Sequence, residues 1–271
     1  MLRVIISPAK KMNPGSDAFA PRAVPMQTPQ ATRLLAALEA LTEEQLQALW
    51  NVSDRLLPAC LNTLDSLRRT GLPTTSDNLA DPAWSARLAP ALFAYVGLQY
   101  QSIAPGVLDE DALAWMADHL RIISGFYGCV RPFDAVLPYR LEMGARLEVD
   151  GQRDLYGYWG ASIAEALGAD LPPHDTLQVV NLASVEYARA VLPHLSARSS
   201  CTTCLFGESV RNGKPVQRST ASKTARGSMV RWMAERAVSD PEDLAHFDLG
   251  YRYEPGLSRP DTLVFMRNDA N

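Results

Sequence analysis

The segment HLRIISGFYGCVRPFDAVLPYRLEMG, residues 119–144, is the most informative stretch of this chain. Apolar residues at helical spacing lead into Ser124, and similar spacing resumes at Val130, beyond Gly125 and Gly128. Two glycines three positions apart permit a tight turn whose backbone N–H groups can approach a phosphate closely. The pattern indicates a helix-hairpin-helix-like element, which would grip a DNA backbone, although such hairpins usually place one residue between their glycines. An ordinary αα-hairpin without a ligand is the alternative.

The end of the same segment brings Tyr139, Arg140 and Glu142 close together in sequence. Arginine is suited to bidentate contacts with phosphate or carboxylate groups, and tyrosine can stack or form a hydrogen bond. If the protein is an enzyme, Glu142 is the leading candidate for its general acid or base. Arg140 and Glu142 could equally form a structural ion pair, and the sequence does not separate these roles.

Two other basic segments are candidates for contacting an anion. The apolar run at residues 4–6 predicts a strand, and Lys10 follows it closely. This would place a cation at the carboxyl end of the strand, where ligand clefts often lie. Lys223 and Arg226 precede an expected helix at residues 228–238, where free N–H groups and the helix dipole would favour an anion. In an enzyme, Lys10 or Lys223 would orient an anionic substrate.

The composition is that of an ordinary folded protein, with 47% apolar and 21% charged residues over 271 positions. A net charge of −4 argues against a protein that coats nucleic acid through its overall charge, but it allows a local basic surface. Residues 211–236 carry seven cations and one acid, which favours a polyanion-binding face on the C-terminal third. A solvated face with no partner is the alternative.

The sequence predicts a cytoplasmic protein without a membrane partner. The first apolar run is too short for a signal peptide, and no later run is long enough to cross a bilayer. The cysteines are then expected to be reduced thiols, and Cys201 and Cys204 lack the second ligand pair of a zinc site. Since the four histidines are scattered, we expect neither a metal site nor a cofactor.

The hydrophobic pattern places strands and helices in different parts of the chain. Helices dominate from about residue 30 to 125, with a capping-box pattern at Thr42 and Gln45 and acids at residues 109–111 that favour a helix start. Buried strands are expected at residues 4–6, 177–182, 198–207 and 261–267. The pattern predicts an α+β fold, with one mixed domain over residues 1–271 and a helical lobe at about 30–125.

Several segments resemble the YaaA family of peroxide stress proteins. They span nearly the whole chain, from about residue 2 to 267, and comprise residues 6–10, 120–128, 139–144, 155–160, 181–187 and 225–227. The resemblance implies a positively charged cleft, a helix-hairpin-helix-like element and binding of duplex or distorted DNA without sequence preference. It also implies a role in limiting damage during hydrogen peroxide stress, associated with control of free iron.

By position, the resemblance and the motifs above give one set of candidate binding residues. They are Lys10, Arg121, Gly125, Tyr127, Gly128, Arg131, Tyr139, Arg140, Glu142, Lys223 and Arg226. The chain departs from the family pattern at Val96 and Leu98, where polar or charged residues are common, and at Thr224, where a second lysine is common. These departures favour an alternative function, in which the cleft of a divergent enzyme takes a small anionic metabolite or nucleotide.

Overall fold

The computed structural model describes residues 1–15, 19–172 and 174–268, and its core is a seven-stranded sheet. The strand order is β12-β13-β9-β8-β1-β5-β6, and the five central strands run parallel, with antiparallel strands at both edges. The bounds are β1 Leu2–Ile6, β5 Leu120–Ser124, β6 Gly128–Val130, β8 Leu177–Asn181, β9 Ser199–Gly207, β12 Tyr251–Tyr253 and β13 Thr262–Arg267. The expected mixed fold is confirmed, but its mostly parallel sheet is typical of α/β rather than α+β proteins.

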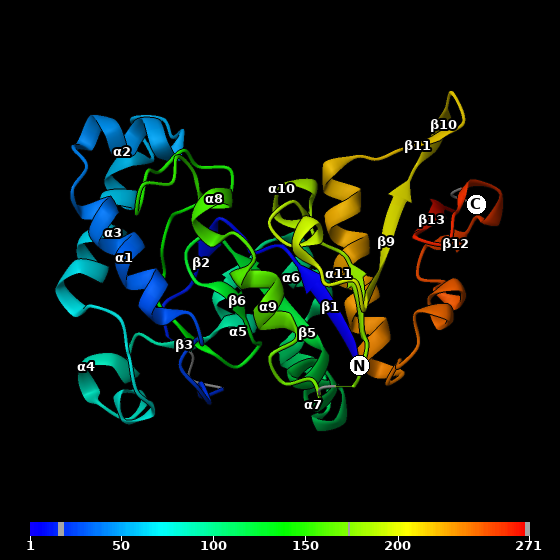
Figure 1. Cartoon of the computed structure of the whole chain (residues 1–271), viewed down its shortest axis with the longest axis horizontal. Helices are drawn as coiled ribbons and strands as arrows, with labels where there is room; N and C mark the ends of the chain where they lie inside the picture. Colours follow the sequence, from blue (N-terminus) through cyan, green and yellow to red (C-terminus); the bar gives the residue numbers. More distant parts are fainter. Residues whose placement is uncertain (16–18, 173, 269–271) are drawn as a thin grey trace.

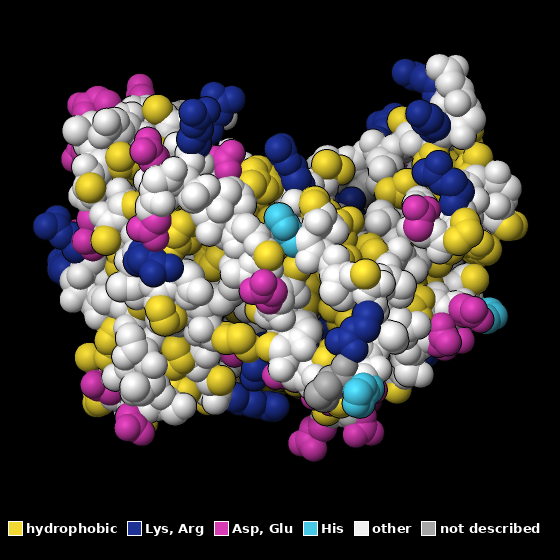
Figure 2. Space-filling model, viewed as in Figure 1, with side chains coloured by type: hydrophobic (Ala, Val, Ile, Leu, Met, Phe, Trp, Pro, Cys, Tyr) yellow, Lys and Arg dark blue, Asp and Glu magenta, His cyan; other side chains and the backbone are white. Residues whose placement is uncertain are grey.

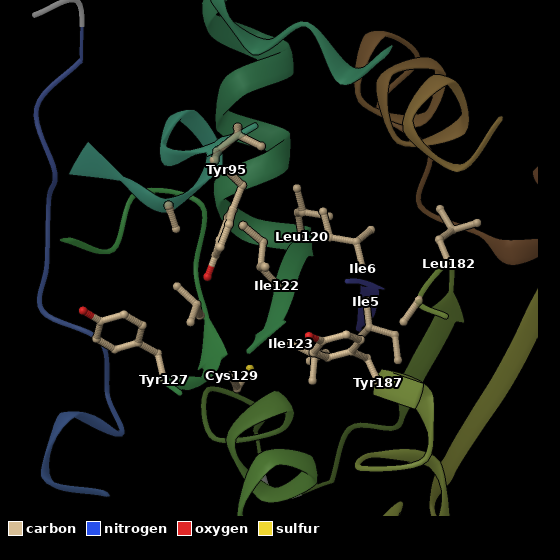
Figure 3. Packing of buried hydrophobic residues seen from close by; sticks show 14 of the residues in the cluster. Ile5, Ile6, Tyr95, Leu120, Ile122, Ile123, Tyr127, Cys129, Leu182 and Tyr187 are labelled. Atoms are coloured by element: carbon tan, nitrogen blue, oxygen red, sulfur yellow. The ribbon is translucent and has the colours of Figure 1, made fainter. Parts of the chain in front are cut away.

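The four strands expected from apolar runs are all present, as β1, β8, β9 and β13. Every residue of β1 is buried, as expected for a central parallel strand covered on both faces. Figure 3 shows Ile5 and Ile6 of β1 near Ile122 and Ile123 of β5, which is its neighbour in the sheet. Burial of these side chains on both faces favours the central position of β1 in the sheet.

The helices expected before residue 125 are present, but they occupy two places. In Figure 1, α1, α2 and α3 lie apart from the large sheet, whereas α6 and α7 lie close to it. The helices are α1 Thr28–Glu39, α2 Glu43–Trp50, α3 Leu57–Thr70, α4 Pro82–Ser85, α5 Ala91–Ala94, α6 Leu98–Ile103, α7 Glu110–His119, α8 Leu155–Trp159, α9 Ser162–Leu167, α10 Val185–Ala188 and α11 Ser219–Glu235. Gln45 and Thr42 form the expected capping box of α2, and Asp109 caps α7.

Shorter strands form three separate two-stranded pairs. These pairs are β2 Lys11–Met12 with β4 Tyr95–Val96, β3 Ala89–Pro90 with β7 Ala135–Val136, and β10 Ser209–Arg211 with β11 Lys214–Val216. The β10–β11 hairpin projects from the end of β9 and forms one extremity of the molecule (Figure 1). Its exposed tip carries Arg211 and Lys214.

The element predicted as helix-hairpin-helix is instead a β-hairpin, formed by β5 and β6. Residues 120–130 are all buried, and the Ser124 Oγ accepts hydrogen bonds from the N–H groups of Phe126 and Tyr127 at 3.1 and 2.9 Å. The turn therefore has no free N–H pair facing solvent that could bind a phosphate. Helical periodicity was the wrong interpretation because a short apolar run cannot by itself distinguish a buried strand from a helix.

Asp134 gives the fold a predicted pH dependence. Its side chain is 2% exposed, and burial raises its pKa to about 7, although Oδ2 accepts a hydrogen bond from the Arg131 N–H at 2.8 Å. A carboxyl group whose pKa is raised in the folded state stabilises the fold while protonated, and this contribution is lost as the pH rises toward the folded-state pKa. Between pH 5 and pH 8, the free energy of unfolding should therefore fall by about 3 kcal/mol.

The Asp134→Asn variant tests this expectation, because asparagine keeps an oxygen that can accept from the Arg131 N–H and cannot ionise. Urea unfolding at pH 5 and pH 8 should show a clearly smaller pH-dependent loss of stability in the variant than in the unmodified protein. Equal pH dependence in the two proteins would show that Asp134 does not carry this effect.

Candidate functional site

A pocket of about 550 Å³ opens at the carboxyl ends of β1 and β8. Ser7 follows β1 and Ser184 follows β8, and the Ser184 N–H donates a hydrogen bond to the Ser7 Oγ at 2.8 Å. In the sheet, β5 and β8 are the two neighbours of β1 and lie on opposite sides of it. The chain forms β5 before β8, so the direction in which strands are added reverses at β1. Such a reversal leaves a crevice between adjacent strands, and ligands of parallel α/β sheets usually bind there.

Three chain segments complete the walls of this pocket. Ser219, Lys223 and Arg226 line it from α11, and their i, i+4, i+7 spacing places them on one face of that helix. The stretch of residues 96–100, from β4 into α6, forms a second wall, and residues 139–142 form a third. The pocket thus depends on segments from very different parts of the sequence.

Glu142 holds two of the pocket's cations side by side. Its Oε1 lies 2.8 Å from the Lys10 Nζ and 3.1 Å from the Arg140 Nη2. The Lys10 side chain is 65% exposed, so this ion pair contributes little to stability. Its clearer effect is on position, because the shared carboxylate keeps both cations at the same side of the pocket.

Two pocket arginines have buried N–H groups without a partner. Within the described residues, the Nε atoms of Arg140 and Arg226 are buried and have no hydrogen-bond acceptor. Arg226 also forms no ion pair with any carboxylate of the described chain, and burial lowers the pKa of its guanidinium. Removing a cation from water without a counter-charge costs stability, so an anion entering the pocket would relieve this cost.

A network of buried hydroxyl groups fixes the backbone behind Arg140. The Tyr139 hydroxyl lies 2.7 Å from the Ser124 Oγ and 3.0 Å from the Tyr95 hydroxyl. Burial raises the pKa of Tyr139 to about 12, so its hydroxyl stays protonated near neutral pH. Tyr139 therefore acts as a rigid support for residues 139–142.

Comparison with known proteins identifies the chain's relatives. Residues 2–257 match the family model described as peroxide stress protein YaaA. The chain belongs to the YaaA family. It is 41% identical to a UPF0246 protein of Pediococcus pentosaceus, with all of both chains covered. Related UPF0246 proteins of Desulfitobacterium hafniense and Lachnoclostridium phytofermentans are 38% and 36% identical, and at least 98% of each chain is covered.

The structure brings six of the candidate residues of this YaaA-family chain to one pocket, namely Lys10, Tyr139, Arg140, Glu142, Lys223 and Arg226. Lys223 and Arg226 reach it from within a helix, because α11 begins at Ser219. The expectation that they form a loop at a helix N-terminus was therefore wrong. Their side chains contribute cations to the pocket. The free backbone N–H groups belong to the first turn of α11, which begins at Ser219.

Arg121 and Arg131 lie outside this pocket, where both are close to the carboxylate of Asp170. Each has an Nη atom 3.7 Å from an Asp170 oxygen, and Arg121 also donates to the carbonyl oxygens of residues 117, 118 and 120. Arg3 of β1 joins the same group, with an Nη 3.6 Å from Asp170. Arg3 and Arg121 both donate to the carbonyl oxygen of Asp118, which ties the end of α7 to the sheet, whereas Arg131 is 42% exposed and lies against Asp170.

Gly125, Tyr127 and Gly128 also lie outside the pocket, inside the β5–β6 hairpin. The buried Tyr127 hydroxyl accepts a hydrogen bond from the Leu137 N–H at 3.1 Å. Gly128 has a φ of +72°, and an added Cβ would lie 2.2 Å from the Gln27 Oε1. Both glycines are needed for tight packing, since a Cβ on Gly125 would lie 2.9 Å from a backbone oxygen.

Motif reasoning missed several residues that line the YaaA-family pocket, including Ser184, Glu186 and Tyr187. Two signals were available, because residues 181–187 belong to the segments that resemble the family and they follow the predicted strand 177–182, where carboxyl ends of parallel strands tend to form ligand sites. Within the ranges that the structure describes, no group of three or more His, Cys, Asp or Glu side chains could hold a metal ion. None of the helices described there is long and apolar enough to cross a membrane.

Proposed function

We propose that this YaaA-family protein acts in the cytoplasm during hydrogen peroxide stress by binding duplex or distorted DNA through its phosphates. The observation that carries the proposal is the pair of pocket arginines, Arg140 and Arg226, whose buried Nε atoms have no acceptor within the described chain. Guanidinium groups bind phosphate oxygens in a bidentate manner. Phosphate contacts position a protein on DNA without reading its bases, which agrees with binding that is independent of sequence.

The charge of the pocket lining supports the same proposal. Its basic residues are Lys10, Lys11, Arg140, Lys223 and Arg226, and its acidic residues are Glu142 and Glu186. The formal balance of the lining is therefore 5 − 2 = +3, although the whole chain has a net charge of −4. Figure 2 shows the surface hollowed between the part of the molecule that holds α1, α2 and α3 and the β10–β11 hairpin. Lys and Arg side chains lie along both rims of this hollow. A local field of this kind can attract a polyanion despite the negative total charge.

Fluorescence anisotropy of a labelled duplex, titrated with the full chain across salt concentrations, tests the proposal. If about four phosphates are contacted, log K should fall with log salt concentration with a slope of about −3 to −4. Duplexes of unrelated sequence should give the same affinity within about threefold. No binding at about 50 mM salt, or binding without salt dependence, would contradict DNA binding through this surface.

A second candidate is an enzyme that acts on a small anionic metabolite or nucleotide. It is favoured by the pocket volume of about 550 Å³, which lies within the usual range for small-molecule sites. Glu142, however, is engaged by both Lys10 and Arg140, so its most direct role is to position these cations. We therefore assign no reaction to it.

A further inference from the structure

The pocket has room for one nucleotide but not for a double helix. Its volume of about 550 Å³ lies within the usual range for sites that enclose a small molecule, which is far less than a segment of double helix occupies. A duplex resting on the rim can reach Lys10, whose side chain is 65% exposed. The Arg140 side chain is only 18% exposed, so a phosphate must enter the pocket to meet it.

Besides Lys10 and Lys11, the cations that line the pocket come from two of its walls, and Lys223 is the exposed one among them. Arg140 belongs to the segment of residues 139–142, while Lys223 and Arg226 lie one turn apart on α11. Glu142 restrains Arg140 from behind, and no carboxylate of the described chain pairs with Arg226. This geometry fits one compact group with several acceptor oxygens, such as a phosphate.

The wall beside these cations is apolar. Val96, Leu98 and Tyr100 line it, and Leu98 is one of the large apolar side chains that the fold leaves exposed, at 40%. Exposed apolar side chains inside a pocket often contact a ligand. Because this wall adjoins the cations, the pocket can bind a molecule with a phosphate at one end and a flat aromatic ring system, whose faces contact apolar side chains, at the other.

We propose that the pocket binds one nucleoside monophosphate unit, with its phosphate at Arg140, Lys223 and Arg226 and its base against Val96 and Leu98. The unit can be a free nucleotide, or a nucleotide at a strand end or extruded from a helix, since all present the same chemistry. Only the DNA-borne source rests on the proposed function above. In that case the pocket explains how a protein that binds any sequence could favour broken or distorted DNA.

Isothermal titration calorimetry of the full chain with dAMP, deoxyadenosine and inorganic phosphate tests the proposal. The Kd of dAMP should be at least about tenfold lower than that of either fragment, because only dAMP contacts both ends of the pocket. Comparable affinities for dAMP and inorganic phosphate would overturn the assignment of the apolar wall to a base.

Three variants locate the contacts. Arg226→Gln should weaken both dAMP and phosphate about tenfold or more, whereas the exposed Leu98→Ser should weaken dAMP several-fold and leave phosphate unchanged. Lys214→Gln, on the β10–β11 hairpin outside the pocket, is the control and should bind dAMP normally. If Leu98→Ser binds dAMP as the unmodified protein does, the proposed position of the base is wrong.

Competition experiments separate the sources of the nucleotide. If dAMP displaces a labelled duplex with a single-stranded overhang but not a closed dumbbell duplex, the unit in the pocket belongs to DNA. If dAMP binds without displacing either DNA, the pocket takes free nucleotides. If no nucleoside monophosphate binds at millimolar concentration while duplex binding persists, the nucleotide proposal fails and DNA binding stands. Binding of dAMP without binding of any DNA would reject the proposed function and retain the nucleotide site.

Discussion

The Gly227→Ala variant is expected to lose about 3 kcal/mol of folding stability, although Gly227 lies inside a helix. A Cβ at this position would lie 2.1 Å from the backbone oxygen of Gln99 and 2.8 Å from the Cβ of Ser102. Alanine favours a helix interior over glycine by about 1 kcal/mol, so propensity alone predicts stabilisation. The steric effect is larger, because a backbone carbonyl cannot move aside without displacing α6.

Urea unfolding followed by circular dichroism measures this loss, and Gly106→Ala is the matched control. A Cβ on Gly106 would meet no atom within 4 Å, so its stability should change by less than about 0.5 kcal/mol. Since α6 and α11 both line the pocket, Gly227→Ala should also weaken ligand binding in the protein that remains folded. A variant as stable as the unmodified protein would show that the two helices can separate at little cost.

The sequence was most informative where burial is nearly complete or where capping residues follow a known pattern. Val4 to Ile6 predicted a buried strand correctly, because its residues are β-branched and a turn signal follows, which favours a strand where an apolar run alone would be ambiguous. Thr42 and Gln45 likewise marked the start of α2, since their side chains satisfy N–H groups that the helix leaves free. Both signals are local and need no knowledge of tertiary contacts.

The start of α11 could not be predicted by the same reasoning. The first turns of this helix are buried through the small residues Ser222, Ala225 and Gly227, which produce no pattern of large apolar side chains. Their small size permits the close approach of α6, which is a tertiary property. The sequence therefore placed Lys223 and Arg226 in a loop, although it identified both as candidates for the pocket.

The candidate site was partly predicted because its cations occur in distinct motifs, but motifs do not show which way a side chain points. Arg121 lies within β5, where it pairs in register with Ile5 of β1. In a sheet covered on both faces, its side chain reaches the carbonyl groups at the end of α7 instead of the pocket. Arg140 lies 19 positions later in the sequence and does line the pocket. The two arginines can be told apart only when residues 120–124 are known to form a strand.

Arg226→Met is expected to change stability and DNA binding in opposite directions. The Arg226 guanidinium is largely buried, its pKa is lowered by burial, and within the described chain it has no carboxylate partner. Methionine has a similar length and carries no charge, so the free energy of unfolding should rise by about 1 kcal/mol. DNA affinity should fall by at least about tenfold, because a charge-assisted contact with phosphate is lost.

Combining Arg226→Met with Arg140→Gln should lower DNA affinity by about two to four orders of magnitude, since each lost contact is worth about 1.5–3 kcal/mol. Lys10 still pairs with Glu142 in this double variant, so no carboxylate is left without a partner. Arg231→Met is the control, because Arg231 lies on α11, pairs with Glu235 and does not line the pocket. Its DNA affinity should stay within about twofold of the unmodified protein. A double variant that is destabilised and still binds DNA would show that both arginines serve the fold. A double variant that is stable and no longer binds DNA would show that they bind phosphate.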